Sequence, residues 1–201
     1  MGLREQKKQA TRSTISWSAI RLIVQRGYEN VLVEDIAKEA GVSARTVNNY
    51  FGSKAEAVAA RHLDRCHMMA EALRERPAEE PLWEAITHAM LDQLRPGPEV
   101  TAHPRPDVDA WAAGLRRMMA VPAIQAETLR AGMLAEAEVA AAVAERTGTD
   151  PTDLYPRLVA SAALSAQNVV SQTFINSGIG MGRLLTDALR QIAAGLPPPS
   201  K

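Results

Sequence analysis

Apolar residues recur every three or four positions along most of the chain, which is the spacing of α-helices with one buried face. The first such segment spans about residues 5–26. Two short amphipathic segments follow at about 33–40 and 44–50, with Gly41 between them. Glycine ends helices readily, and Ser43 is placed to cap the next one by accepting a backbone N–H. The pattern therefore predicts a helix-turn-helix.

The rest of the chain is also helical in pattern, divided by prolines and glycines. No segment shows the strict alternation of a half-buried strand. Six further helices are expected at about residues 54–76, 81–95, 107–120, 122–147, 151–176 and 181–194. We predict an all-α, nine-helix protein with two domains. Residues 1–54 would form a three-helix helix-turn-helix domain, and residues 55–201 a second, larger helical domain.

The outer face of the 44–50 helix carries polar side chains suited to DNA. Arg pairs with guanine through two hydrogen bonds, Asn pairs with adenine, and Thr reaches phosphate or a thymine methyl group. An ordinary helical hairpin with a solvated polar face also fits the turn pattern taken alone. The residues expected to contact DNA are Ser43, Arg45, Thr46, Asn48 and Asn49, with Tyr50 and Lys54 at the rim and Lys7 and Lys8 near the N-terminus.

The net charge of the chain is zero, which by itself argues against a nucleic-acid-binding protein. The distribution of charge along the chain, however, is compatible with nucleic-acid binding. Residues 1–55 carry nine Lys/Arg and five Asp/Glu, a balance of +4, and the remainder carries fourteen and eighteen, a balance of −4. A basic head on an acidic body places the head on a phosphate backbone.

Three segments within the first quarter of the chain share a further pattern. They read Val33-Glu-Asp-Ile-Ala37, Ala40-Gly-Val-Ser43 and Tyr50-Phe51-Gly-Ser-Lys54. With Ile15 and Gly27 ahead of them, this run resembles the N-terminal domain of the tetracycline-repressor (TetR) family of transcriptional regulators. One departure is Leu32, where the family usually has a Thr or Ser that caps the second helix and touches phosphate.

The resemblance implies a homodimer that binds a palindromic double-stranded DNA operator, with its interface on the last two helices. Both of these helices carry small and apolar residues at helical spacing, and four such helices from two subunits form a bundle. The alternative is that both apolar faces are internal core. The interface residues expected are Leu158, Ala162, Val169, Thr173, Leu185, Leu189 and Ile192.

Large adaptable side chains between residues 81 and 147 suggest a pocket for a small-molecule effector, since methionine fills irregular space. Simple core packing explains any single one equally well. The run from Glu127 to Asn176 also resembles the C-terminal domain of a TetR subgroup described as binding acyl-CoA-like ligands, which implies an arginine facing phosphate or carboxylate. The ligand-binding candidates are Trp83, Met90, Trp111, Met118, Arg130, Met133, Asn168 and Gln172.

The sequence gives little evidence for catalysis, cofactor or metal binding, or membrane insertion. No catalytic constellation stands out, we expect no cofactor, and His62 and Cys66 have no further ligand nearby to complete a metal site. The most apolar stretch, residues 158–170, is too short to span a membrane. A single cysteine and the lack of a signal-peptide pattern fit the cytoplasm. The preferred interpretation is a ligand-responsive DNA-binding repressor; the alternatives are an all-helical enzyme and a helix-turn-helix adaptor that binds only protein.

Overall fold

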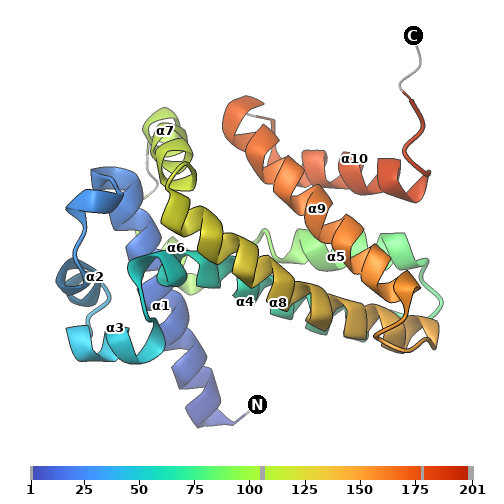
Figure 1. Cartoon of the computed structure of the whole chain (residues 1–201), viewed down its shortest axis with the longest axis horizontal. Helices are drawn as coiled ribbons and strands as arrows, with labels where there is room; N and C mark the ends of the chain where they lie inside the picture. Colours follow the sequence, from blue (N-terminus) through green and yellow to red (C-terminus); the bar gives the residue numbers. More distant parts are fainter. Residues whose placement is uncertain (1, 105–106, 178, 199–201) are drawn as a thin grey trace. The chain divides into compact units, whose positions relative to one another are not determined.

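The computed structural model describes residues 2–104, 107–177 and 179–198. Within these ranges the chain forms ten α-helices, one 3-10 helix and no strand (Figure 1). The elements are α1 (Leu3–Arg26), η1 (Tyr28–Asn30), α2 (Val33–Glu39), α3 (Ala44–Tyr50), α4 (Lys54–Glu75), α5 (Leu82–Asp92), α6 (Pro98–Thr101), α7 (Val108–Met119), α8 (Pro122–Thr147), α9 (Leu154–Ser177) and α10 (Met181–Ala193). The all-α prediction is confirmed, and α6, between the helices expected at about 81–95 and 107–120, is additional to the nine helices expected.

The chain packs as two compact units. Unit 1 comprises residues 1–63 and 96–131, and unit 2 comprises residues 64–95 and 132–201. Helices α4 and α8 each contribute to both units. The packing thus groups α6 and α7 with the helix-turn-helix, whereas the two domains expected from the sequence, with a boundary after residue 54, stay a prediction.

The core of unit 1 forms where α1, α2, α3 and α7 bury their apolar faces. Helix α1 contributes Ile15 and Ile23, which are fully buried, and α7 contributes Met118. Gly114 of α7 lies directly against the backbone of α1, since a Cβ atom there would fall 2.4 Å from the carbonyl oxygen of Val24. A side chain at Gly114 would push the two helices apart, so this glycine sets their close packing.

Unit 2 is built around α5, α9 and α10, with the second halves of α4 and α8. Helix α10 packs against both α9 and α5. Its Leu185 and Leu189 are buried, as is Ile86 of α5. In the described part of the chain no helix is both long and apolar enough to cross a bilayer.

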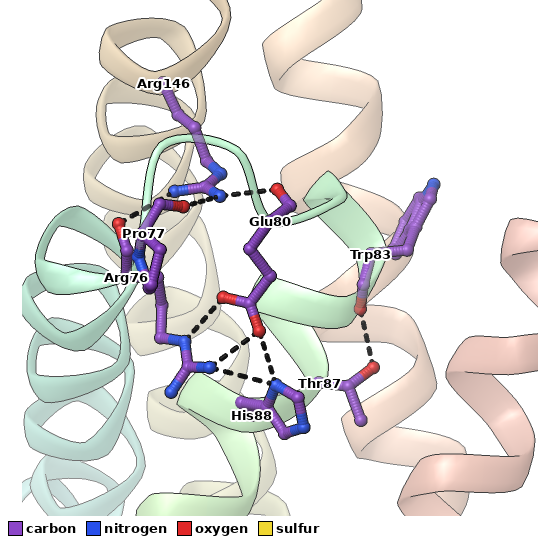
Figure 2. Close-up of polar contacts among 7 residues, drawn as sticks. All are labelled: Arg76, Pro77, Glu80, Trp83, Thr87, His88 and Arg146. Carbon is purple, nitrogen blue, oxygen red and sulfur yellow. Dashed lines mark hydrogen bonds and ion pairs between the residues drawn. The ribbon is translucent and has the colours of Figure 1, made fainter.

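The connection between α4 and α5 is held by a cluster of polar contacts within unit 2 (Figure 2). The Arg146 guanidinium of α8 donates hydrogen bonds to the backbone carbonyls of Arg76, Pro77 and Glu80. The Glu80 carboxylate accepts from Arg76 at 2.6 Å and pairs with Nδ1 of His88 at 2.7 Å. Hydrogen bonding from Arg76, and then from His88, lowers the pKa of Glu80 to about 2.

Candidate nucleic-acid interface

The turn between α2 and α3 has the local chemistry that the sequence predicts. Gly41 adopts a φ of +68°, in the left-handed region that favours glycine. Ser43 is the N-cap of α3, because its Oγ accepts from the backbone N–H of Thr46 at 3.1 Å. The hydroxyls of Ser43 and Thr46 are also 2.8 Å apart. The predicted cap is confirmed, and it fixes where α3 begins.

Helix α3 buries one side and exposes the other. Val47 and the following Phe51 are each 2% exposed within the core of unit 1. Arg45, Asn48 and Asn49 are exposed on the outer side. The structure therefore brings these three predicted DNA contacts together on one surface, which we call the α3 face.

Lys54, also predicted to contact DNA, is engaged within unit 1. Its ammonium donates to the carbonyl oxygens of Tyr28 at 2.6 Å and Val31 at 2.9 Å. It also lies 4.1 Å from the centre of the Tyr28 ring, a cation–π contact. Lys54 thus joins the first residue of α4 to the loop that precedes α2. This corrects the view of Lys54 as a simple rim cation, because two of its three N–H groups are used internally.

Other cations of the head divide into paired and exposed groups. Arg21 pairs with Glu39, Arg26 lies 3.7 Å from Asp35, and Arg12 stacks over the Phe51 ring at 4.8 Å. Lys7 and Lys8 are exposed on the first turns of α1, where Lys8 also lies 3.9 Å from Glu5. Both lysines belong to this helix, which begins at Leu3, two residues before the start expected from the sequence.

The N-terminus of α2 shows how the chain manages without the usual Thr or Ser. The Leu32 side chain has no hydrogen-bonding atom and is 62% exposed. Its backbone N–H donates to Oδ2 of Asp35 at 3.0 Å. Asp35 thus supplies one half of a capping box, and no hydroxyl supplies the other. An Asp three residues after the cap position was the signal that sequence reasoning missed.

Helix α9 exposes apolar side chains that unit 2 does not cover. Leu154, Leu158 and Val169 are 74%, 58% and 62% exposed. Ala162 and Thr173, also predicted at the interface, are half-buried. The spacing from 154 to 158, 162 and 169 places these positions along one side of the helix. We call this the α9 face.

Two of the α10 residues predicted at the same interface are buried within their own subunit. Leu185 is 2% exposed and Leu189 is fully buried, both within unit 2. They pack inward because α10 lies on α5 and α9, so neither offers surface to a second subunit. Ile192, near the end of α10, is half-buried.

The residues predicted to bind a ligand are divided between the two units. Trp111 stacks on Trp17 at 5.6 Å between ring centres, and Met118 is buried in the core of unit 1. Arg130 is exposed and pairs with Glu127. Trp83 and Met90 belong to unit 2, where they line different hollows.

The other three candidates point to solvent. Met133 is 70% exposed, and both Asn168 and Gln172 lie on the outer side of α9. Neither amide is buried within its own subunit. Of the eight candidates, Met90 alone lines the cavity considered below.

Comparison with known proteins adds to this geometry. Residues 17–60 match the profile of bacterial regulatory proteins of the tetR family, and residues 80–197 match that of the MftR C-terminal domain. Over 175 residues the chain is 31% identical to the HTH-type transcriptional regulator TcmR of Streptomyces glaucescens, covering 85% of this chain and 76% of that protein.

Solved structures show the same fold at lower identity. The fatty acid degradation regulator FadR of Bacillus halodurans has a TM-score of 0.57 and 15% identity, covering 94% of this chain and 97% of that one. FadR of Thermus thermophilus, a TetR family repressor in complex with lauroyl-CoA, has a TM-score of 0.54 and 19% identity with the same coverage. Identities this low show similarity of fold. They do not show that this chain binds the same ligands as those proteins.

Proposed function

This chain belongs to the TetR family of DNA-binding transcriptional regulators, and on that premise we propose that it is a dimeric repressor released from its operator by a small amphipathic ligand. Membership of the family makes the chain a regulator rather than an enzyme. The α3 face is the single observation that most supports operator reading. Its exposed Arg45, Asn48 and Asn49 are the side-chain types that read guanine and adenine in the major groove.

Dimerisation is supported by the α9 face. A soluble protein rarely leaves a row of large apolar side chains exposed along a helix without a partner. A second copy of the same helix is a suitable partner, because a two-fold interface is self-complementary. Two α3 helices presented by such a dimer would enter successive major grooves, about 34 Å apart, on a palindromic site.

Release by a ligand is the third part of the proposal. FadR of Thermus thermophilus, which shares this fold, was solved in complex with lauroyl-CoA, so an amphipathic effector is a reasonable class for this chain. Helix α4 starts beside the helix-turn-helix at Lys54 and continues into unit 2, which makes it a continuous connection for a ligand signal. A ligand shifts the equilibrium only if it binds the DNA-incompetent state more tightly.

Selection from random double-stranded DNA tests operator binding directly. The expected outcome is an enriched palindrome whose half-sites lie about one helical turn apart. Arg45→Ala and Asn48→Ala, tested on the enriched site, are expected to relax base preference. If selection enriches no sequence, or the variants bind as the wild type does, the operator-reading proposal fails.

Ligand release requires a separate test on the same operator. A titration of long-chain acyl-CoAs, fatty acids, short carboxylates and cationic drugs in a shift assay should find a class that weakens binding by roughly 5- to 150-fold. By linkage, operator DNA should weaken binding of that ligand by the same factor. A protein whose operator affinity responds to none of them would be a constitutive DNA-binding protein.

A further inference from the structure

Unit 2 contains a cavity that is not part of either surface described above. It lies among α4, α5, α9 and α10 and has a volume of about 60 Å³. This is several times the ~10–15 Å³ that one water requires, and far below the ~300–1,000 Å³ of a site for a drug-sized ligand. The space suits a molecule of a few heavy atoms, whereas a lauroyl chain would not fit.

Half of the apolar residues that line the cavity are methionines, the others being Leu94, Val170 and Leu185. Met69 of α4 and Met90 of α5 are buried, and Met181 begins α10. Thioether side chains are flexible and polarizable, so they adjust to small ligands of varied shape. Three of them from three different helices give the cavity an adaptable apolar wall.

The polar part of the lining has one charged group. Of the described residues that line the cavity, Arg65 alone is charged, and Gln93 and Gln167 add side-chain amides. Ser171 also lines it, although its hydroxyl donates to the carbonyl of Gln167 at 2.8 Å. The Gln93 amide already donates to the carbonyl of Ala89 at 3.5 Å, so Arg65 is the lining group best suited to a carboxylate, which Arg binds through two parallel hydrogen bonds.

We propose that this cavity binds a compact monocarboxylate of roughly three to five carbons, with its carboxylate at Arg65 and its short apolar tail against Met69, Met90 and Met181. The proposal names the effector class for the ligand response, and therefore rests on the proposed function. It places the effector in unit 2, in a cavity that only Met90 lines among the residues that the sequence suggested for a ligand.

A ligand at this position has a direct structural connection to the DNA-binding head. Arg65 and Met69 lie on the same helix as Lys54, whose ammonium bonds the carbonyls of Tyr28 and Val31. Moving α4 to accommodate a ligand would therefore act on the contacts that hold the loop before α2.

Methionine methyl groups offer a readout that does not depend on DNA. In the full-length protein labelled with ¹³C-methyl methionine, butyrate should shift the signals of Met69, Met90 and Met181. The exposed Met68 and Met133 of unit 2 serve as internal controls and should not move. Butyramide, which has the same shape without the charge, should bind at least 10-fold more weakly, and dodecanoate should not shift the three cavity signals.

Variants test the role of the guanidinium. Arg65→Met should lower butyrate affinity by at least 10-fold, and Arg65→Lys should retain part of it. Arg183→Met is the matched control, because Arg183 is exposed on α10 and does not line the cavity. If Arg65→Met fails to fold, the wild-type methyl shifts and the butyrate–butyramide comparison still decide the matter.

The outcomes separate this inference from the proposed function. The inference would be overturned if no short carboxylate shifts the methyl signals of the cavity methionines, or if butyrate and butyramide bind equally well. This holds even if a longer ligand releases the operator. If butyrate binds in an Arg65-dependent manner but operator affinity is unchanged, the carboxylate site is supported. The claim that a ligand at this site releases operator DNA is then contradicted.

Discussion

The two units of this protein expose opposite kinds of helical face. In unit 1, α3 buries Val47 and presents Arg45, Asn48 and Asn49 to solvent. In unit 2, α9 presents Leu154, Leu158 and Val169. A polar face with one guanidinium and two amides suits the grooves of DNA, whereas an apolar row requires another apolar surface. The chemistry of each exposed face therefore indicates which partner covers it.

The two associations should also respond differently to salt. DNA binding releases counterions from phosphates, so its affinity falls steeply as salt rises. Burial of apolar side chains has no such dependence and is not weakened by moderate salt. The comparison of the two faces therefore predicts that the dimer persists at salt concentrations at which operator affinity falls.

The largest expected effect is on the α9 face. Val169→Glu would place an unpaired charge in the interface, at a cost of about 3–5 kcal/mol, or a factor of roughly 100 to 1,000 or more in the dimer dissociation constant. Because Val169 is 62% exposed within its own subunit, the monomer should stay folded. Sedimentation velocity should show a folded monomer with much weakened operator binding.

Leu185→Glu provides the contrast for that experiment. Leu185 is buried inside unit 2, so a charge there should unfold the subunit rather than separate two folded ones. A Val169→Glu protein that remains a dimer with unchanged operator affinity would move the interface away from α9.

A second prediction separates Lys54 from the cations that face solvent. Lys54→Met removes two hydrogen bonds to backbone carbonyls, and should destabilise the protein by about 1–3 kcal/mol. For a chain of this size each kcal/mol corresponds to a fall of roughly 2–4 °C in Tm. Lys7→Met is the control: Lys7 is exposed, so its loss should reduce the salt dependence of DNA binding and leave Tm unchanged. If Lys54→Met leaves Tm unchanged, the internal hydrogen bonds of Lys54 do not stabilise the protein, and Lys54 would be assigned as a phosphate contact.

The α3 face should lose specificity in a position-dependent manner. Arg45→Ala and Asn48→Ala are each expected to cost about 1–3 kcal/mol of discrimination at particular bases, with little effect on stability. Binding to a panel of single-base operator variants measures this. A uniform loss of affinity across the panel would mean that these residues contact phosphate instead of bases.

Leu32 offers a change that should increase affinity. Leu32→Thr adds a hydroxyl that completes the cap of α2, for which about 0.5–2 kcal/mol of stability is typical. The same hydroxyl reaches phosphate in related proteins, according to the family resemblance, so operator binding should tighten at all sequences. Leu32→Val, which adds no hydroxyl, should do neither; equal gains from both variants would assign the effect to side-chain shape.

The smallest effect is expected at the polar cluster of unit 2, where charged groups bind one another. Glu80 has its pKa lowered from 4.5 to about 2, first through Arg76 and then through His88. The stability that it contributes is therefore present above pH ~4.5 and is lost as pH falls toward ~2. Glu80→Gln should lower Tm at pH 7 and make less difference at pH 3. Glu79→Gln, at the exposed neighbouring position, should have little effect at either pH; a Glu80→Gln deficit independent of pH would contradict the ion-pair account.

Local signals in the sequence were sufficient for the fold and the α3 face. Gly41 and Ser43 act within a few residues of their partners, so their effect on the turn and cap is readable from the chain. Longer-range packing was not readable. Lys54 bonds carbonyls 23 and 26 residues away. Whether Asn168 faces inward depends on which neighbouring helices cover α9, and periodicity alone does not reveal that.

The same limit applies to the burial of α10 residues. Leu185 and Leu189 belong to an amphipathic pattern that suits an interface and a core equally well. Only the packing of α10 on α5 and α9 decides in favour of the core. The cavity at Arg65 was missed because its lining comes from four helices that are distant in sequence.

The mass of the protein–operator complex tests the central claim most directly. Sedimentation velocity on a selected palindromic operator should show two chains per duplex, and the Val169→Glu variant should lose the cooperative two-chain complex at concentrations where the wild type is saturated. A complex of one wild-type chain on one duplex, with undiminished affinity in Val169→Glu, would contradict the account of a dimer that reads DNA through α3 and assembles through α9.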